Sequence, residues 1–331
     1  MSVEMSNTGL KINYSVRPAK SIERKMMKDI FARLFVFEEL AEYQYIGFGS
    51  KYFTDFILFH RALGFRNMIS IECDSRNTQR YEFNKPYEFI QMHFGYSYDV
   101  IPKLSYKSRS IIWLDYDYAF NQEMLSDLIF LVENLSSGSM LNLSFSSEVP
   151  NFEDLKRNYP HISKNYYKRY FENIFGDIGI DLDDRGWNKN HRFTNFLNQK
   201  IYSRLLAAID VRNSDLQNSE KFNLEQIFYF SYADGIPMTT IGWIVFKENE
   251  RHKFDSLNLN KFNYYASQVD QPYIIGNCPL TMKEIHLLMS KMPLNQTDDL
   301  PIDSSIIPET MQRDFAQNYQ YFPSFHEVEA Y

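Results

Sequence analysis

The stretch YQYIGFGS, residues 43–50, decides the fold of this chain. It is a short β-rich run that closes on Gly47 and Gly49, and a helical pattern, KYFTDFILFHRALG, follows it directly. A second strand pattern, NMISIECD at 67–74, carries Glu72 near its end. A strand, a glycine turn, a helix and a second strand that ends in a carboxylate are typical of a nucleotide-binding βαβ unit.

The alternation of strand and helix continues to about residue 146. Further strands are predicted at 89–95, 109–117 and 140–146, and helices at 17–39, 77–86 and 121–138. Because parallel neighbours need a crossover connection, this rhythm predicts a Rossmann-like, doubly wound α/β sheet. Ligands of such sheets bind outside the carboxyl ends of the strands.

The rest of the chain has a different pattern. Residues 150–222 are helical and polar and are predicted to form an insertion, whereas 224–248 gives two strands of a hairpin. We therefore expect seven strands, the last two antiparallel, followed by a tail with one convincing helix at 280–292. The predicted organisation is an N-terminal helical segment, an α/β domain that contains the insertion, and a C-terminal extension: 1–39, 40–250 and 251–331.

The composition is that of a globular, mildly acidic protein. The 331 residues carry 35 basic and 42 acidic side chains, a formal charge of −7, which argues against a purely electrostatic grip on nucleic acid. Cys73 and Cys278 are too few for a disulfide framework, and no apolar run has the length of a membrane span. We therefore expect a cytoplasmic protein without a membrane partner, whose oligomeric state the sequence does not indicate.

The glycine pattern limits the kind of nucleotide. Gly47 and Gly49 would let the backbone approach a cofactor closely, and Glu72 could accept both hydroxyls of a ribose. The third glycine of the dinucleotide fingerprint is missing, because Tyr52 occupies its place. A small adenosine-bearing cofactor without a pyrophosphate therefore fits better than NAD, and a plain tight turn is the alternative.

A second motif, DYDY at 115–118, ends an apolar strand. It places Asp115 and Asp117 at the carboxyl edge of the sheet, beside the expected cofactor position. Either carboxylate could orient a substrate, act as a general base or ligate a divalent cation. The alternative is that one of them caps the helix that follows and the other is solvated.

Together these motifs resemble those of the class I S-adenosylmethionine-dependent methyltransferases. The YIGFGS run resembles the glycine motif of that superfamily, Glu72 its ribose-binding acid, and MHFGYS at 92–97 the segment that borders the adenine. DYDY resembles the catalytic motif after the fourth strand. The hairpin at 224–248 resembles the antiparallel strands that distinguish this superfamily from dehydrogenases, and the resemblance covers roughly 40–147 together with this hairpin.

The resemblance implies S-adenosylmethionine as the cofactor and a set of site residues. Asp115 and Asp117 are the implied catalytic residues. The implied cofactor-binding residues lie in the glycine turn, at the end of the second strand and in the adenine segment: Gly47, Gly49, Ser50, Glu72, Tyr96 and Ser97. In the adenine segment, Tyr96 would stack on the base and Ser97 would hydrogen-bond to its edge.

Within the superfamily, the catalytic motif favours an oxygen acceptor. LDYDY is closer to the Asp-x-Asp motif of small-molecule O-methyltransferases than to the Asn/Asp-Pro-Pro-Tyr motif of N-methyltransferases that act on nucleic acids. Metal-dependent members have an Asp-Asn pair after the fifth strand, where this chain has Asn142-Leu143-Ser144, so no metal is expected. The methyl acceptor is not identified, and the alternative function is a catalytically inactive methyltransferase-like module that binds a nucleotide or scaffolds a partner.

The N-terminal helix carries a cluster of basic residues. Arg17, Lys20 and Arg24 recur at spacings of three and four and would share one helical face. Such a face could contact phosphate or nucleic acid, although a solvated helix face explains most runs of this kind.

Overall fold

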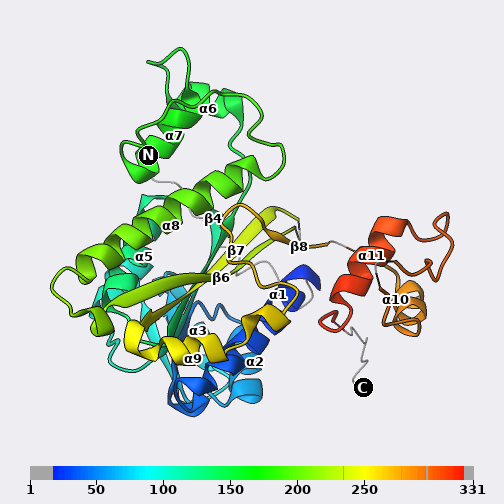
Figure 1. Ribbon diagram of the computed structural model, residues 1–331, viewed down its shortest axis with the longest axis horizontal. Helices are drawn as coiled ribbons and strands as arrows, with labels where there is room; N and C mark the ends of the chain where they lie inside the picture. Colours follow the sequence, from blue (N-terminus) through cyan, green and yellow to red (C-terminus); the bar gives the residue numbers. More distant parts are fainter. Residues whose placement is uncertain (1–17, 234, 277, 296, 324–331) are drawn as a thin grey trace.

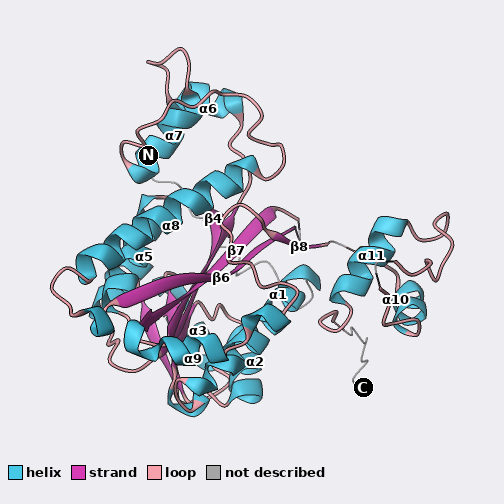
Figure 2. Ribbon diagram, in the orientation of Figure 1, coloured by secondary structure: helices cyan, strands magenta, loops and turns pink. Residues whose placement is uncertain are grey.

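The computed structural model describes residues 18–233, 235–276, 278–295 and 297–323, and one mixed β-sheet forms its centre (Figure 1; Figure 2). Within these ranges the sheet has eight strands in the order β3-β2-β1-β4-β5-β7-β6-β8. The first five strands pair in parallel, and the order reverses between β1 and β4. β7 is antiparallel to both of its neighbours, and β8 pairs in parallel with β6.

The elements follow the expected alternation through the first half of the chain. The strands are β1 (Gln44–Gly47), β2 (Asn67–Glu72), β3 (Ile90–Phe94), β4 (Ser110–Ala119), β5 (Ser139–Ser146), β6 (Phe222–Ala233), β7 (Pro237–Lys247) and β8 (Tyr273–Ile275). The helices are α1 (Pro18–Arg33), α2 (Thr54–Leu63), α3 (Thr78–Asn84), α4 (Ser97–Val100), α5 (Gln122–Asn134), α6 (Phe152–Asn158), α7 (Tyr166–Phe175), α8 (Arg192–Arg212), α9 (Arg251–Ser256), α10 (Met282–Met289) and α11 (Glu309–Asn318).

Both faces of the sheet are apolar because helices cover both. Successive side chains of a strand point to opposite faces, so Ile112 and Leu114 of β4 pack in the cluster that includes α5, α7 and α8. Ile111 and Trp113 pack on the other face, in the cluster that includes α1 and α2. In Figure 1, α5 and α8 lie together on one side of the sheet, and α1 and α2 lie on the other. By the same alternation, Asp115 belongs to the face that α1 covers.

Helix α1 is an integral part of this core. Pro18 begins it, as is common at a first helical position, and it gives way to a 3₁₀ turn over Leu34–Val36. Nine of its sixteen residues are buried, and three of the nine are charged. The helix therefore covers the sheet with charged as well as apolar side chains.

The C-terminal extension contacts α1 as well as the sheet edge. Lys25 Nζ donates to the carbonyl of Tyr321 at 2.9 Å, and the hydroxyls of Tyr264 and Tyr321 lie 3.3 Å apart. Tyr273 of β8 donates to Asn318 Oδ1 at 2.9 Å. Helices α10 and α11 lie to one side of the sheet, beyond β8 (Figure 1).

The predicted doubly wound fold with an antiparallel terminal hairpin is confirmed, and the details differ in three places. The sheet has an eighth strand, β8, whose three residues are too few to show an alternating pattern. The N-terminal helix ends at Arg33 rather than at 39. Helix α11 is absent from the prediction because its buried positions include Gln312 and Asn318, which hide the apolar period. None of the helices in the described ranges has the length and apolar character needed to cross a bilayer.

Gly242 offers a test of the packing between β6 and β7. It lies opposite Phe228 next to a bulge, and a methyl group at Gly242 would overlap the Phe228 ring. We expect Gly242→Ala to lower the free energy of unfolding by about 1–3 kcal/mol through overpacking. Urea unfolding measures this change, and Phe228→Leu in the Gly242→Ala background should recover part of it. A Gly242→Ala variant as stable as the parent would contradict this account of the packing.

Candidate active site

The topological switch point of the sheet lies between β1 and β4. Gly47, the last residue of β1, pairs with Ser70 of β2 on one side and with Trp113 of β4 on the other. Glu72 and Asp115 lie two residues further along these neighbouring strands. The structure therefore brings the glycine turn and both predicted acids to the same edge, where ligands of open α/β sheets bind.

The glycine turn is closely packed. A Cβ atom on Gly49 would lie 2.6 Å from the Phe53 ring and 2.7 Å from Ser70 Oγ. The Gly49 N–H donates to Ser70 Oγ at 3.1 Å, and the Phe53 N–H donates to the Gly49 carbonyl at 2.7 Å. Ser50 and Phe53 both have left-handed backbone conformations, with φ of 47° and 49°. Only glycine fits at position 49, and the chain leaves β1 in a narrow turn that leads directly to α2.

Glu72 is a buried carboxylic acid with an unused oxygen. Its side chain lies at the end of β2, the residue is 8% exposed, and Oε1 has no hydrogen-bond partner among the described residues. Burial raises the pKa of Glu72 to about 8, although the backbone N–H of Ser50 acts in the opposite direction. A buried acceptor without a partner is costly, and ribose hydroxyls would satisfy it. The residues present therefore fit the ribose of an adenosine cofactor.

Asp115 and Asp117 have different environments although they share a face of β4. The Asp115 carboxylate accepts a hydrogen bond from Lys20 Nζ at 2.6 Å, in an ion pair that is mostly buried. Burial first, and then the charge of Asp115, raise the pKa of Asp117 to about 6. Asp117 also acts on the thiol of Cys73, which follows Glu72, so the ends of β2 and β4 are close. One aspartate is held by a cation, and the other is poised to exchange a proton near neutral pH.

The adenine segment has partners of its own. Tyr96 is 42% exposed, and its ring stacks on that of Tyr98 with centroids 5.2 Å apart. Tyr116 Oη lies 2.9 Å from both Ser97 Oγ and Asp127 Oδ2, so the Ser97 hydroxyl already has a contact on the α5 side of the sheet. The roles expected of Tyr96 and Ser97 toward adenine stay predictions.

A buried charged cluster on α1 is the part of the site that the sequence analysis missed. Lys20 Nζ contacts Glu23 Oε2 at 2.9 Å, in addition to Asp115, and donates to the Tyr232 hydroxyl at 3.1 Å. Thr240 of β7 donates to the other oxygen of Glu23. The cluster thus joins α1 to β4, β6 and β7 at the carboxyl edge of the parallel strands.

The expectation of an exposed basic face on α1 needs correction. Lys20 is 4% and Arg24 is 6% exposed, so neither is offered to solvent or to a polyanion, and Arg17 lies outside the described residues. The apolar pattern of α1 could have indicated this burial. Ala19, Ile22 and Met26 surround the charged residues and leave α1 with little polar face.

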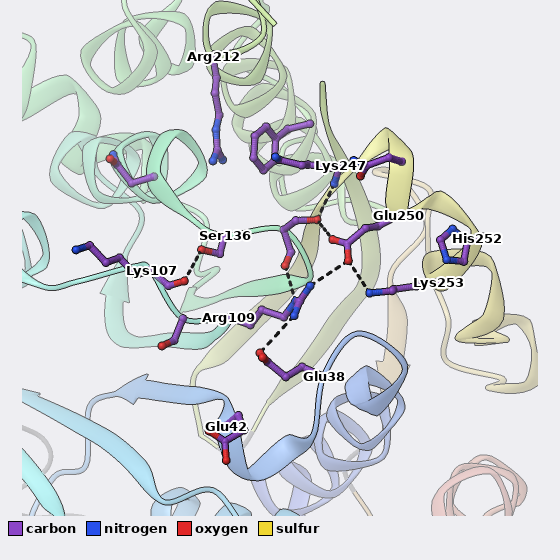
Figure 3. A pocket seen from close by; sticks show the side chains of 15 residues that line it. Glu38, Glu42, Lys107, Arg109, Ser136, Arg212, Lys247, Glu250, His252 and Lys253 are labelled. Carbon is purple, nitrogen blue, oxygen red and sulfur yellow. Dashed lines mark hydrogen bonds and ion pairs between the residues drawn. The ribbon is translucent and has the colours of Figure 1, made fainter. Parts of the chain in front are cut away.

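A large polar pocket lies at the opposite edge of the sheet, where the parallel strands begin (Figure 3). Its volume is about 940 Å³. Its charged groups largely pair with one another: Glu250 contacts Arg109 at 3.0 Å and Lys253 at 2.7 Å, and Glu38 lies 3.4 Å from Arg109. None of the predicted site residues lines this pocket. Within the described ranges, no cluster of three or more histidine, cysteine or acidic side chains is arranged to hold a metal ion.

The switch-point site and the antiparallel β7 define a Rossmann-like protein of the methyltransferase type. The chain matches, over residues 12–330, the model of a family described as "Putative O-methyltransferase". It therefore belongs to this family, and the resemblance of its motifs to those of methyltransferases is confirmed. Among curated proteins, no significant match is found.

Solved structures offer only remote likenesses. LepI in complex with S-adenosylmethionine is 8% identical, with a TM-score of 0.32, over 62% of this chain and 43% of LepI. Trm1 from Pyrococcus horikoshii, also with S-adenosylmethionine, is 10% identical, with a TM-score of 0.45, over 77% of this chain and 61% of Trm1. An O-methyltransferase from Bacillus cereus is 13% identical, with a TM-score of 0.32, over 66% of this chain and 80% of the other. The chain thus spans less than two thirds of LepI and Trm1, and we draw no conclusion about activity from these likenesses.

Glu72 provides a test that separates binding from folding. Because its pKa rises from 4.5 unfolded to about 8 folded, the folded chain retains a proton between these values that the unfolded chain releases. Its contribution to stability is therefore lost as the pH rises from 4.5 to 8. We expect Glu72→Gln to raise the free energy of unfolding at pH 8.5 by about 1–3 kcal/mol. The same variant should weaken S-adenosylmethionine binding by about 1–3 kcal/mol, through loss of a carboxyl oxygen that would accept from the ribose.

Calorimetry and urea unfolding at pH 5 and pH 8.5 measure the two effects. Glu88→Gln, on the loop before β3, is a control that should change neither. Unchanged cofactor affinity in folded Glu72→Gln would remove Glu72 from the ribose site.

Proposed function

We propose that this protein transfers a methyl group from S-adenosylmethionine to an oxygen atom of its acceptor at the carboxyl edge of β1, β2 and β4. The observation that carries the proposal is the unpartnered buried oxygen of Glu72 beside the Gly49 turn. Burial of this oxygen has a cost for the fold and it has no partner among the described residues, which supports a ligand as its partner. The family of the chain supports the choice of reaction.

The cofactor would lie across the ends of β1 and β2. Gly47 and Gly49, with Ser50, would seat its amino-acid end, because the turn has no room for side chains beyond Cα at position 49. Glu72 would bind the ribose hydroxyls. Tyr96, which is already exposed and stacked, would border the adenine.

Asp115 and Asp117 would then have different roles in the transfer. The cofactor supplies a methyl group on a positively charged sulfur. When bound, it would transfer this methyl group to the acceptor oxygen, with the O–CH₃ bond forming as the S–CH₃ bond breaks and the electron pair of the broken bond staying on sulfur. The hydroxyl proton passes to Asp117, whose pKa near 6 leaves it ionised and able to accept a proton at neutral pH. Asp115 is already paired with Lys20, so it serves as a fixed charge that orients the reacting groups.

The structure and the composition also bear on the acceptor and on the location of the protein. The acceptor must present a hydroxyl, and the half-buried Tyr118 next to Asp117 would form part of its surroundings. Lys20 and Arg24 are buried and are therefore not offered to nucleic acid, which is not the partner that we propose. We infer a cytoplasmic location from the two free cysteines, a composition that suits a reducing compartment.

Two measurements in sequence test the proposal. Calorimetry with S-adenosylmethionine and S-adenosylhomocysteine should give saturable binding to one site. A transfer assay with methyl-labelled S-adenosylmethionine and a panel of phenols, catechols, carboxylates and aliphatic alcohols should then label a hydroxyl-bearing acceptor. Cofactor binding without methyl transfer to any compound of the panel would favour the alternative, a catalytically inactive methyltransferase-like module. Absence of cofactor binding would refute the proposal.

The pH dependence of the reaction tests the role of Asp117. Because the base must be ionised, we expect the transfer rate to rise with pH through about 6, the pKa of Asp117, and to level off above it. Asp117→Asn should lower kcat by roughly 10²-fold or more and abolish this rise, with little change in cofactor affinity. Asp154→Asn, which removes an exposed carboxylate on α6, is the matched control. A rate profile that keeps its midpoint in Asp117→Asn would assign the proton transfer to another group.

A further inference from the structure

The structure points to Lys20 as a positioning residue of the active site. We propose that the Lys20 ammonium on α1 fixes the Asp115 carboxylate at the end of β4, and through it sets the charge that faces the proton acceptor Asp117. The assignment of a reaction step to Asp117 rests on the proposed function. The electrostatic coupling of Lys20, Asp115 and Asp117 is a property of the protein alone.

The geometry around the ammonium group is specific. Lys20 Nζ has three N–H donors, and it lies 2.6 Å from Asp115 Oδ1, 2.9 Å from Glu23 Oε2 and 3.1 Å from the Tyr232 hydroxyl. It also lies over the Trp113 ring, 4.5 Å from its centroid. A hydrated surface lysine would exchange among partners, whereas this one is 4% exposed and is enclosed by groups from α1, β4 and β6. Lys20 can therefore determine where the Asp115 carboxylate lies.

The charged and titratable groups near Asp115 and Asp117 come from several elements. Asp115 faces Lys20 and Glu23 of α1, Tyr232 of β6, and Tyr45 of β1 with its partner Asp55 of α2. Asp117 faces Asp115 on its own strand, Cys73 beyond β2 and Tyr118.

The Asp115 carboxylate couples the Lys20 ammonium to the Asp117 carboxyl group. It contacts Lys20 and also raises the pKa of Asp117. Removal of the ammonium would take away the cation that is paired with Asp115, although the Arg24 guanidinium stays nearby, and Asp117 would then hold its proton more tightly. The effect of Lys20 on Asp117 should therefore depend on the presence of Asp115.

A cycle of variants tests this dependence without cofactor or acceptor. In protein labelled with ¹³C-aspartate, the carboxyl signal of Asp117, identified by its loss in Asp117→Asn, is titrated by NMR. We expect Lys20→Met to raise the pKa of Asp117 from about 6 to about 7. Asp115→Asn should lower it, and Lys20→Met added to Asp115→Asn should produce little further change. Lys20→Arg, which keeps the charge, should leave the pKa of Asp117 close to that of the parent.

Two further variants guard against a structural explanation. Lys28→Met removes a lysine from the same helix, whose partner is the neighbouring Asp29, and should not change the titration. Should Lys20→Met fail to fold, Lys20→Met/Glu23→Gln keeps the balance of buried charge and should raise the pKa of Asp117 in the same way. An unchanged Asp117 titration in either folded Lys20 variant, or an equal change in the Asp115→Asn background, would overturn the proposal.

A second arm uses the reaction itself. With an acceptor in hand, Lys20→Met should lower kcat more than tenfold, leave the Kd of S-adenosylmethionine within about threefold, and move the midpoint of the rate profile to higher pH. Lys20→Arg should restore part of the rate. Loss of cofactor binding in the parent would refute the proposed function, yet the NMR cycle would still decide the role of Lys20.

Discussion

The carboxyl edge of the sheet depends on one buried ammonium group, that of Lys20. Burial of a charge is tolerated only when it is paired and hydrogen-bonded, because the lost hydration must be replaced. Here Asp115, Glu23 and Tyr232 supply the acceptors, and Glu23 in turn accepts from Thr240. The contacts continue through hydroxyl groups of β5 and β7 to the indole N–H of β4, so each polar group on this path has a partner. Removal of one member would leave buried charge uncompensated, which explains why α1 cannot be separated from the strands that it covers.

Glu72 differs from Lys20 because one of its buried oxygens has no hydrogen-bond partner among the described residues. Lys20 and Glu72 are similarly buried and lie near the same edge, yet the fold satisfies the first completely and leaves an oxygen of the second unused. A chain that can build the Lys20 cluster could have paired or replaced Glu72 as well. Functional sites are where such costs persist, and the contrast therefore supports the proposal that Glu72 lies on the ligand side of the edge while the Lys20 cluster supports it.

The sequence predicts the parts of the molecule that depend on local pattern. The strand–turn–helix around Gly47 and Gly49, the acid at Glu72 and the carboxylates of DYDY follow from period and position, and parallel strands bring them to one edge. The Lys20 cluster could not be predicted, because Lys20 is separated along the chain from Asp115 by 95 residues and from Tyr232 by 212. Spacing on α1 correctly suggests that Lys20 and Arg24 lie close together, but spacing does not tell whether solvent or a carboxylate faces them. For the same reason, the edge strand β8 and helix α11, with their few apolar contacts, escape prediction.

The location of the missed residues bears on the acceptor. The glycine turn and Glu72 are made by segments that the sequence motifs cover, and these are the segments that we propose to bind the cofactor. The surroundings of Asp115 are made by α1 and by β6 and β7, and α1 is held in turn by the C-terminal extension through Lys25 and Tyr321. Where related proteins share a cofactor and differ in their acceptors, the shared sequence motif forms the cofactor side of the site. Selectivity for the acceptor must then come from the side of the site that this motif does not form. The family motif therefore bears on the methyl donor, whereas we expect the acceptor to be selected by contacts between α1, the terminal hairpin and the extension, which form only in the folded chain.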